Sequence, residues 1–130
     1  MSESYLDCEG FPFESIRRVL GPRSNWPKRA AVKDRRVLRD CHAEMSECLA
    51  CGFVIDSFLE LHHLVGGRGG RSDERTNLLA LCRWCHQKVN TPALPFGRLL
   101  FLKWFHQRED LSWERLTLLH GRWLPELIPC

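Results

Sequence analysis

Two Cys-x-x-Cys pairs constrain this 130-residue chain more than any other feature. Thirty residues separate Cys48-Leu-Ala-Cys51 from Cys82-Arg-Trp-Cys85. Thiolate pairs at this spacing can each supply two corners of the tetrahedron around Zn²⁺, and bound zinc contributes folding free energy in domains with small cores. A redox-active pair is the alternative for each motif alone, but neither pair lies in the strand-to-helix context of a thioredoxin motif. The four cysteines therefore predict one structural zinc site, with Gly52 in the tight turn after Cys51.

The other cysteines and the apolar stretches bear on the compartment. The chain has seven cysteines, an odd number that argues against a framework made only of disulfides. Cys8, Cys41 and Cys130 have no partner at ligand spacing, so we expect buried or free thiols there. The sequence starts without a secretory signal pattern, and its longest apolar stretch, 99–105, is too short to span a bilayer. These features predict a soluble protein with no membrane partner, in the cytoplasm of a bacterium or of a phage-infected host cell.

Length and pattern predict an α+β fold in one domain of three parts. A chain of this length matches the usual size of a single domain. A hydrophobic fraction of 44% and a charged fraction of 27% are those of a protein that folds. We expect a basic helical segment over 1–47, a zinc-bound core over 48–91 and apolar helices over 92–130.

The central part carries the signals of short strands. Residues 53–55 are aromatic and β-branched, and we expect them to pair with 59–64 as a hairpin. Residues 78–81 are a further strand candidate, and a helix is expected over 84–90.

The C-terminal part carries the signals of two helices. Residues 96–105 are apolar nearly all round, which predicts a buried helix. Ser112 is the expected N-cap of the last helix, with Glu114 favourable to its dipole, and Gly121 is its expected end.

Basic residues gather in the N-terminal part. The formal net charge of +3 indicates a polyanionic partner only weakly, but nine basic residues lie between Arg17 and Arg39 against one acid, Asp34. The run is either a phosphate-contacting surface or a solvated helix face. Arginines in and beside the glycine loop 66–70 either contact phosphate as well or are charged residues of a solvated loop. The candidate DNA contacts are Arg29, Lys33, Arg35, Arg36, Arg39, Arg68 and Arg71.

Histidines and an asparagine are interleaved with the cysteine pairs. The order is Leu61-His62-His63-Leu64-Val65, the glycine loop, Arg75-Thr76-Asn77-Leu78-Leu79, and a histidine directly after the last cysteine. A histidine pair alone is usually structural, and an asparagine alone is an ordinary turn residue. With the two cysteine pairs, five features in order resemble the HNH endonuclease family over residues 48–90. The resemblance implies a ββα-metal fold in which a hairpin and a helix hold one catalytic divalent cation against the scissile phosphate of DNA.

The resemblance also implies a role for each residue. His63 would be the general base that deprotonates the attacking water, because an imidazole titrates near working pH. His62 and His86 would hold the catalytic cation, Mg²⁺, Mn²⁺ or a similar ion. Asn77 would orient His63 through hydrogen bonds across the loop and take no part in the chemistry. Asn90, four residues after His86 and so one helical turn on the same face, would be a further ligand whose amide oxygen binds a hard cation weakly.

The expected function is therefore that of a metal-dependent DNA endonuclease, a phosphodiester hydrolase. Two alternatives are a zinc-stabilised nucleic-acid-binding module without catalysis and a purely structural interaction domain. A scaffold needs only the four cysteines, whereas here a competent residue fills every position that the nuclease chemistry requires. The small size resembles that of phage or mobile-element HNH proteins, and a homodimer or a larger phage or host nucleoprotein complex is compatible with it.

Overall fold

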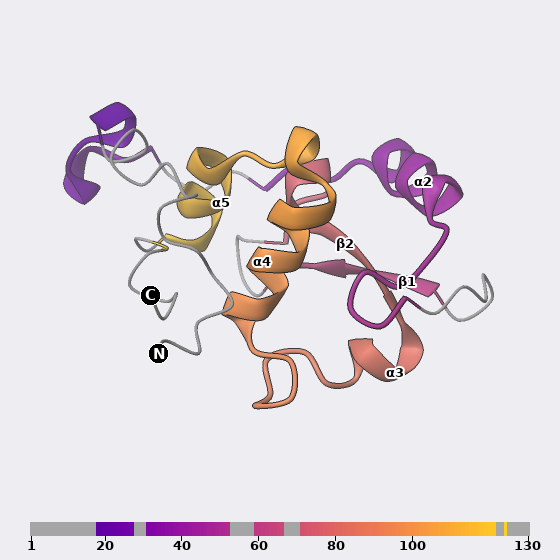
Figure 1. Cartoon of the computed structure of the whole chain (residues 1–130). Coiled ribbons are helices and arrows are strands. Elements are labelled where there is room, and N and C mark those ends of the chain that lie inside the picture. Colours follow the sequence, from indigo (N-terminus) through magenta and orange to yellow (C-terminus); the bar gives the residue numbers. More distant parts are fainter. Residues whose placement is uncertain (1–17, 28–30, 53–58, 67–70, 122–123, 125–130) are drawn as a thin grey trace.

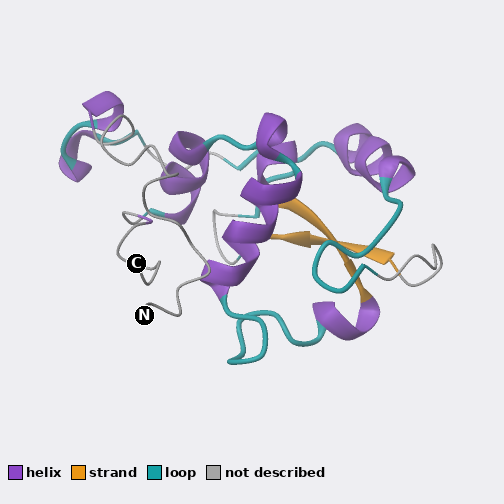
Figure 2. Ribbon diagram, in the orientation of Figure 1, coloured by secondary structure: helices purple, strands orange, loops and turns teal. Residues whose placement is uncertain are grey.

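A two-stranded antiparallel sheet lies at the centre of the computed structural model, which describes residues 18–27, 31–52, 59–66, 71–121 and 124. Helices α2, α3, α4 and α5 accompany the sheet in the described part of the chain, and α4 lies between the sheet and α5, so the expected α+β class is confirmed (Figures 1 and 2). The elements are η2 (Arg23–Asn25), α2 (Arg35–Glu44), β1 (Leu59–His63), η4 (Arg75–Asn77), β2 (Leu78–Cys82), α3 (Arg83–His86), α4 (Phe96–His106), η5 (Arg108–Asp110) and α5 (Trp113–His120).

The two strands of the sheet are joined through the glycine loop. In the register, Leu59 is the Cα partner of Cys82, and His63 is the partner of Leu78. All five residues of β2 are buried, which explains its continuous apolar run. The expected strands over 59–64 and 78–81 are confirmed, each within one residue. The expected partner at 53–55 lies outside the described residues, and the pairing that the structure describes for β1 is with β2.

Helix α2 is shorter than the helical N-terminal segment that the sequence predicts. The side chain of Asp34 is its N-cap and accepts hydrogen bonds from the backbone N–H groups of Arg36 (3.0 Å) and Val37 (3.4 Å). A side-chain acceptor at this position fixes where the first turn begins. Lys33 therefore precedes the helix, and residues 31–34 are not helical, although the sequence predicts a helical segment over 1–47.

Helix α3 is also shorter than expected, and this removes the geometric basis for Asn90 as a ligand. The helix ends at His86 instead of continuing to residue 90. Asn90 has a left-handed backbone, with φ at 60°, and its N–H donates to the carbonyl of Leu94 at 2.8 Å. The following Pro92 disfavours helix in the residue before it. Asn90 does not lie one helical turn beyond His86, so that prediction is corrected.

The last helix agrees with its predicted signals. The Ser112 side chain accepts the N–H of Arg115 at 3.2 Å, and Gly121 ends α5 with φ at 79°. Helix α4 agrees only in part, because Leu99 and Leu100 are fully buried but Phe105 is 60% exposed. The prediction that α4 is buried on all sides is therefore wrong, because the side of the helix that carries Phe105 faces away from the sheet.

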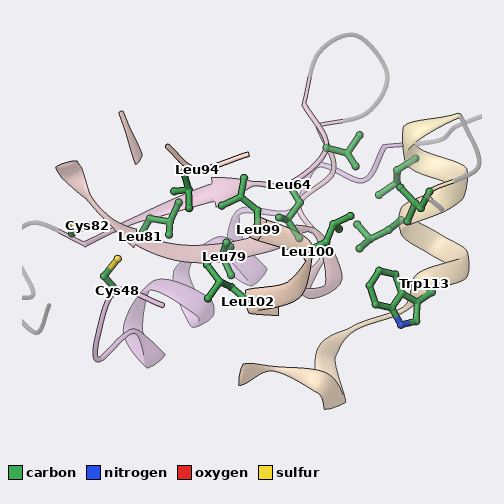
Figure 3. Packing of buried hydrophobic residues seen from close by; sticks show 14 of the residues in the cluster. Cys48, Leu64, Leu79, Leu81, Cys82, Leu94, Leu99, Leu100, Leu102 and Trp113 are labelled. Carbon is green, nitrogen blue, oxygen red and sulfur yellow. The ribbon is translucent and has the colours of Figure 1, made fainter. Parts of the chain in front are cut away.

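The core joins the sheet, the C-terminal helices and two of the cysteines (Figure 3). Its fully buried leucines come from three elements: Leu79 and Leu81 from β2, Leu99 and Leu100 from α4, and Leu116 and Leu119 from α5. Cys48 and Cys82 belong to the same cluster. No helix in the described part of the chain is both long and apolar enough to cross a membrane.

Candidate functional site

The four cysteines of the two pairs come together beside the end of the sheet. The Sγ atoms of Cys48, Cys51, Cys82 and Cys85 all lie within 4.8 Å of one another. Among the described residues, no other group of three or more metal-ligating side chains is as close. Four thiols in this arrangement are positioned to bind one metal ion, and zinc fits a four-sulfur donor set.

Local backbone geometry brings the sulfurs together. Gly52 has φ at 78°, and its N–H donates to the carbonyl of Cys48 at 2.8 Å, so the predicted tight turn is confirmed. At the other pair, the Sγ of Cys82 accepts the N–H of Cys85 at 3.4 Å, at the start of α3. Burial, and then hydrogen bonds with the other thiols, raises the pKa of Cys85. Metal binding would reverse this effect, because a coordinated cysteine is a thiolate.

His62 on β1 and His86 on α3 lie face to edge. Their ring centroids are 5.1 Å apart, with an angle of 70° between the planes. His62 is 9% exposed, and its Nε2 is buried without a hydrogen-bond partner in the described structure. Burial, and then the charges of His86 and His63, lowers the pKa of His62 to about 4, so this ring is neutral near pH 7. A buried neutral imidazole opposite a second imidazole is a suitable donor set for a divalent cation.

Glu60 adds a carboxylate to the two imidazoles. Side chains alternate along β1, so Glu60 and His62 share one face of the strand. Oxygen Oε1 of Glu60 lies 2.8 Å from Nδ1 of His86. An Nδ1–H donated to a carboxylate leaves the Nε2 lone pair of His86 available to a metal. Glu60 was not among the predicted site residues, although its place two residues before His62 on one strand indicates a shared face.

Asn77 makes hydrogen bonds to residues on both sides of the glycine loop. Its Oδ1 accepts the N–H of Val65 at 2.7 Å, and its Nδ2 donates to the carbonyls of Val65 (3.1 Å) and Ser72 (3.0 Å). The backbone carbonyl of Asn77 accepts the N–H of Leu64 at 2.8 Å. Asn77 is fully buried, and its bonds fix the chain directly after His63.

His63 has a partner that the sequence did not indicate. Its Nε2 lies 2.8 Å from Oδ1 of Asp73, and both side chains are nearly buried, at 12% and 9% exposure. Alternation along β1 directs His63 to the face opposite His62. Asp73 follows the glycine loop, and no periodicity in the sequence links it to His63. The pair was therefore not predictable from the sequence.

Comparison with protein families assigns the centre of the chain. Residues 48–91 match the family model of the HNH endonucleases. The matched segment contains the four clustered cysteines, the histidine pair, Asn77 and His86. An HNH segment indicates a nuclease or a nucleic-acid-binding module in general. Comparisons with curated proteins and with solved structures found no match.

Several of the candidate DNA contacts lie close to the HNH segment. Arg35, Arg36 and Arg39 are exposed on α2, where spacings of three and four residues place them on one face. The Nζ of Lys33 donates to the backbone carbonyl of Arg71 at 3.0 Å, so the basic segment and the end of the glycine loop are adjacent. The remaining candidates, Arg29 and Arg68, lie outside the described residues.

Proposed function

We propose that the chain is a metal-dependent DNA endonuclease, with His63 as the general base and one divalent cation held by His62 and His86. The observation that carries this proposal is the buried Nε2 of His62, which has no partner in the described structure and lies opposite His86. Leaving a buried polar atom unsatisfied costs about 1–3 kcal/mol. A zinc-stabilised scaffold gains nothing from this arrangement, whereas a cation site requires such an atom.

The residues present fit a divalent cation. His62 and His86 would hold it, and Glu60 would keep the His86 ring in the required orientation. When bound, the cation would stabilise negative charge on the scissile phosphate and on the leaving oxygen. A neutral imidazole at His62 can bind a metal without first losing a proton.

A side chain of the protein, that of His63, would accept the proton. His63 would take a proton from a water molecule as the water oxygen attacks phosphorus and the P–O3′ bond breaks. The leaving 3′ oxygen would then gain a proton from solvent. Asn77 would hold the start of the glycine loop, and with it the backbone that follows His63, through its bonds to Val65 and Ser72.

The basic residues beside the site would hold the DNA backbone. Arg35, Arg36 and Arg39 present exposed guanidinium groups on α2, and Lys33 lies just before the helix. The N-cap of α2, Asp34, donates its backbone N–H to Asp73, the partner of His63. Phosphates bound along α2 would therefore lie on an element whose N-cap contacts Asp73 directly, with affinity that falls as salt rises.

The second candidate is a zinc-stabilised nucleic-acid-binding module without catalysis. The exposed arginines of α2 favour it, because a basic helix and a four-cysteine cluster are sufficient for binding. The two candidates differ in the role of the histidines. In the endonuclease, His62 and His86 hold a cation and His63 accepts a proton, whereas the binding module needs neither.

Incubation with supercoiled plasmid separates the two candidates. We expect nicking with Mg²⁺ or Mn²⁺, loss of nicking in EDTA, and recovery when excess Mg²⁺ is restored. Zinc content is measured after the EDTA step, so that loss of the structural metal is not mistaken for loss of the catalytic cation. A gel shift without cleavage under every divalent cation would favour the binding module.

A further inference from the structure

We propose that Asp73 is a positioning residue that selects the tautomer of the general base, an inference that rests on the proposed role of His63. Its carboxylate would fix the ring proton of His63 on Nε2 and leave the lone pair on Nδ1. The nitrogen that receives the proton from water would then be Nδ1.

The two oxygens of Asp73 have separate partners. Oδ1 lies 2.8 Å from Nε2 of His63, and Oδ2 accepts the backbone N–H of Asp34 at 3.0 Å. The backbone N–H of Asp73 donates to the carbonyl of Val32 at 2.6 Å, and the Ser72 hydroxyl accepts the N–H of Val32 at 2.8 Å. The carboxylate is therefore held in place from its backbone and from both oxygens.

The chemistry of a carboxylate fixes the direction of the bond to His63. An ionised carboxylate only accepts hydrogen bonds, so the Nε2 that faces it must carry a proton. Burial raises the pKa of Asp73, but hydrogen bonds from His63 and Asp34 outweigh it, and the pKa lies below its usual value. A neutral imidazole has one proton on its two nitrogens, so Nδ1 carries the lone pair.

The same geometry predicts what an amide would do at this position. In Asp73→Asn, the backbone N–H of Asp34 still requires an acceptor, so the amide oxygen takes the place of Oδ2. The NH₂ group then faces Nε2 of His63 and donates to it. The ring proton moves to Nδ1, which loses its lone pair and can no longer accept a proton from water.

We expect Asp73→Asn to lower the single-turnover cleavage rate at saturating DNA by about 10²–10⁴-fold, the usual effect of a positioned base. The DNA concentration for half-saturation, the zinc content and the melting temperature should stay close to wild type. Glu109→Gln, which removes an exposed carboxylate after α4, is the matched control and should cleave normally. In a His63→Ala background, Asp73→Asn should cause no further loss.

Two results would overturn the inference while leaving the nuclease proposal intact. One is an active wild type with Asp73→Asn cleaving at the same saturated rate, and the other is an equal loss from Asp73→Asn in the His63→Ala background. Long-range ¹H–¹⁵N correlation spectra of wild type, which identify the protonated ring nitrogen, provide a test that needs no variant to fold. A proton on Nδ1 of His63 would contradict the inference, and a wild type that never cleaves would contradict the proposed function itself.

Discussion

Alternation along β1 separates two neighbouring histidines into different environments. His62 faces His86 on α3, together with Glu60, whereas His63 faces the opposite way and meets Asp73. Adjacent residues of one strand can therefore serve a cation site and a proton-transfer site without competing for the same partners. His86 has the carboxylate of Glu60 as its partner and His63 has that of Asp73, and each carboxylate has its own testable consequence.

Glu60→Gln tests whether this carboxylate orients His86. An amide in its place holds the Nδ1–H of His86 less strongly, so we expect the affinity for Mn²⁺ or Co²⁺ to fall by about 10–100-fold. Calorimetric titration of the zinc-loaded protein measures this affinity directly. Glu47→Gln, which changes an exposed carboxylate away from the imidazoles, should bind the cation as wild type does. Equal affinity in Glu60→Gln and wild type would show that His86 needs no such partner.

Helix α2 presents its two sides to different surroundings. Its partly buried side, with Val37, Leu38 and Cys41, faces the rest of the molecule, and its arginines are exposed. The helix packs beside β1, and its N-cap residue contacts Asp73. A DNA backbone bound along the exposed side would therefore lie close to His63.

The triple variant Arg35→Ala/Arg36→Ala/Arg39→Ala tests this placement of DNA. Binding should weaken about equally for all sequences, and the dependence of affinity on salt should flatten, because fewer counterions are released. Fluorescence anisotropy across a salt series measures both effects. The double variant Arg98→Ala/Arg108→Ala, on α4 and the turn after it, should keep the wild-type slope. An unchanged slope in the α2 variant would place the DNA elsewhere.

Lys103 on α4 holds the turn that carries Asn77. Its Nζ donates to the carbonyls of Arg75 and Leu78 and to Oε1 of Gln107, each at 2.7 Å, and the residue is 1% exposed. Burial lowers its pKa to about 8, against 10.5 for a free lysine. A group that loses its proton earlier in the folded state than in the unfolded state makes stability rise with pH between those two values.

The free energy of unfolding of wild type should therefore rise relative to Lys103→Met as pH increases from about 8 to 10. Each unit of pKa difference is worth about 1.4 kcal/mol, so the full effect amounts to about 3 kcal/mol. Urea unfolding of both proteins at matched pH values measures the difference. Cysteine and other lysine titrations are common to the two proteins and cancel. Parallel pH dependences would contradict a buried Lys103 with a lowered pKa.

The predictable parts of the structure are those set by neighbours in the chain. Ser112 and Gly121 bound α5 as expected, and the hydrogen bonds of Asn77 across the glycine loop were implied by the resemblance to the HNH endonucleases. The contact between Asp73 and His63 was not predictable, because it depends on how the chain around Asp73 packs against residues 32–34. The end of α3 was not predictable either, because it depends on how the chain turns toward buried Leu94. The division of the chain into one domain of three parts stays a prediction.

The four clustered cysteines connect the site to the core of the described structure. Cys48 and Cys82 are 1% exposed and belong to the same core cluster as the leucines of β2, α4 and α5. A small domain buries little apolar surface, so a metal bound here would contribute part of the folding free energy. Strand β1 and helix α3, which carry the proposed cation ligands, both contribute residues to this core or pack against it.

Cys82→Ser should reduce zinc binding and unfold the centre of the chain. A lost thiolate ligand weakens the site, and metal affinity is linked to folding free energy. Circular dichroism during heating, with zinc content by elemental analysis, measures both. Cys41→Ser, which changes a partly buried thiol outside the cluster, should keep zinc and the melting temperature near wild type. An intact fold without zinc in wild type would contradict a structural role for the four cysteines.

Single-turnover nicking of supercoiled plasmid across a cation titration tests the central claim most directly. Wild type should cleave only with a divalent cation, and His63→Ala should be slower by about 10²–10⁴-fold at every cation concentration, because added metal does not replace a base. His86→Ala should differ by recovering part of its rate as Mn²⁺ or Mg²⁺ rises. Zinc content and DNA affinity should stay unchanged in His63→Ala. Cleavage by His63→Ala at the wild-type rate would contradict the account.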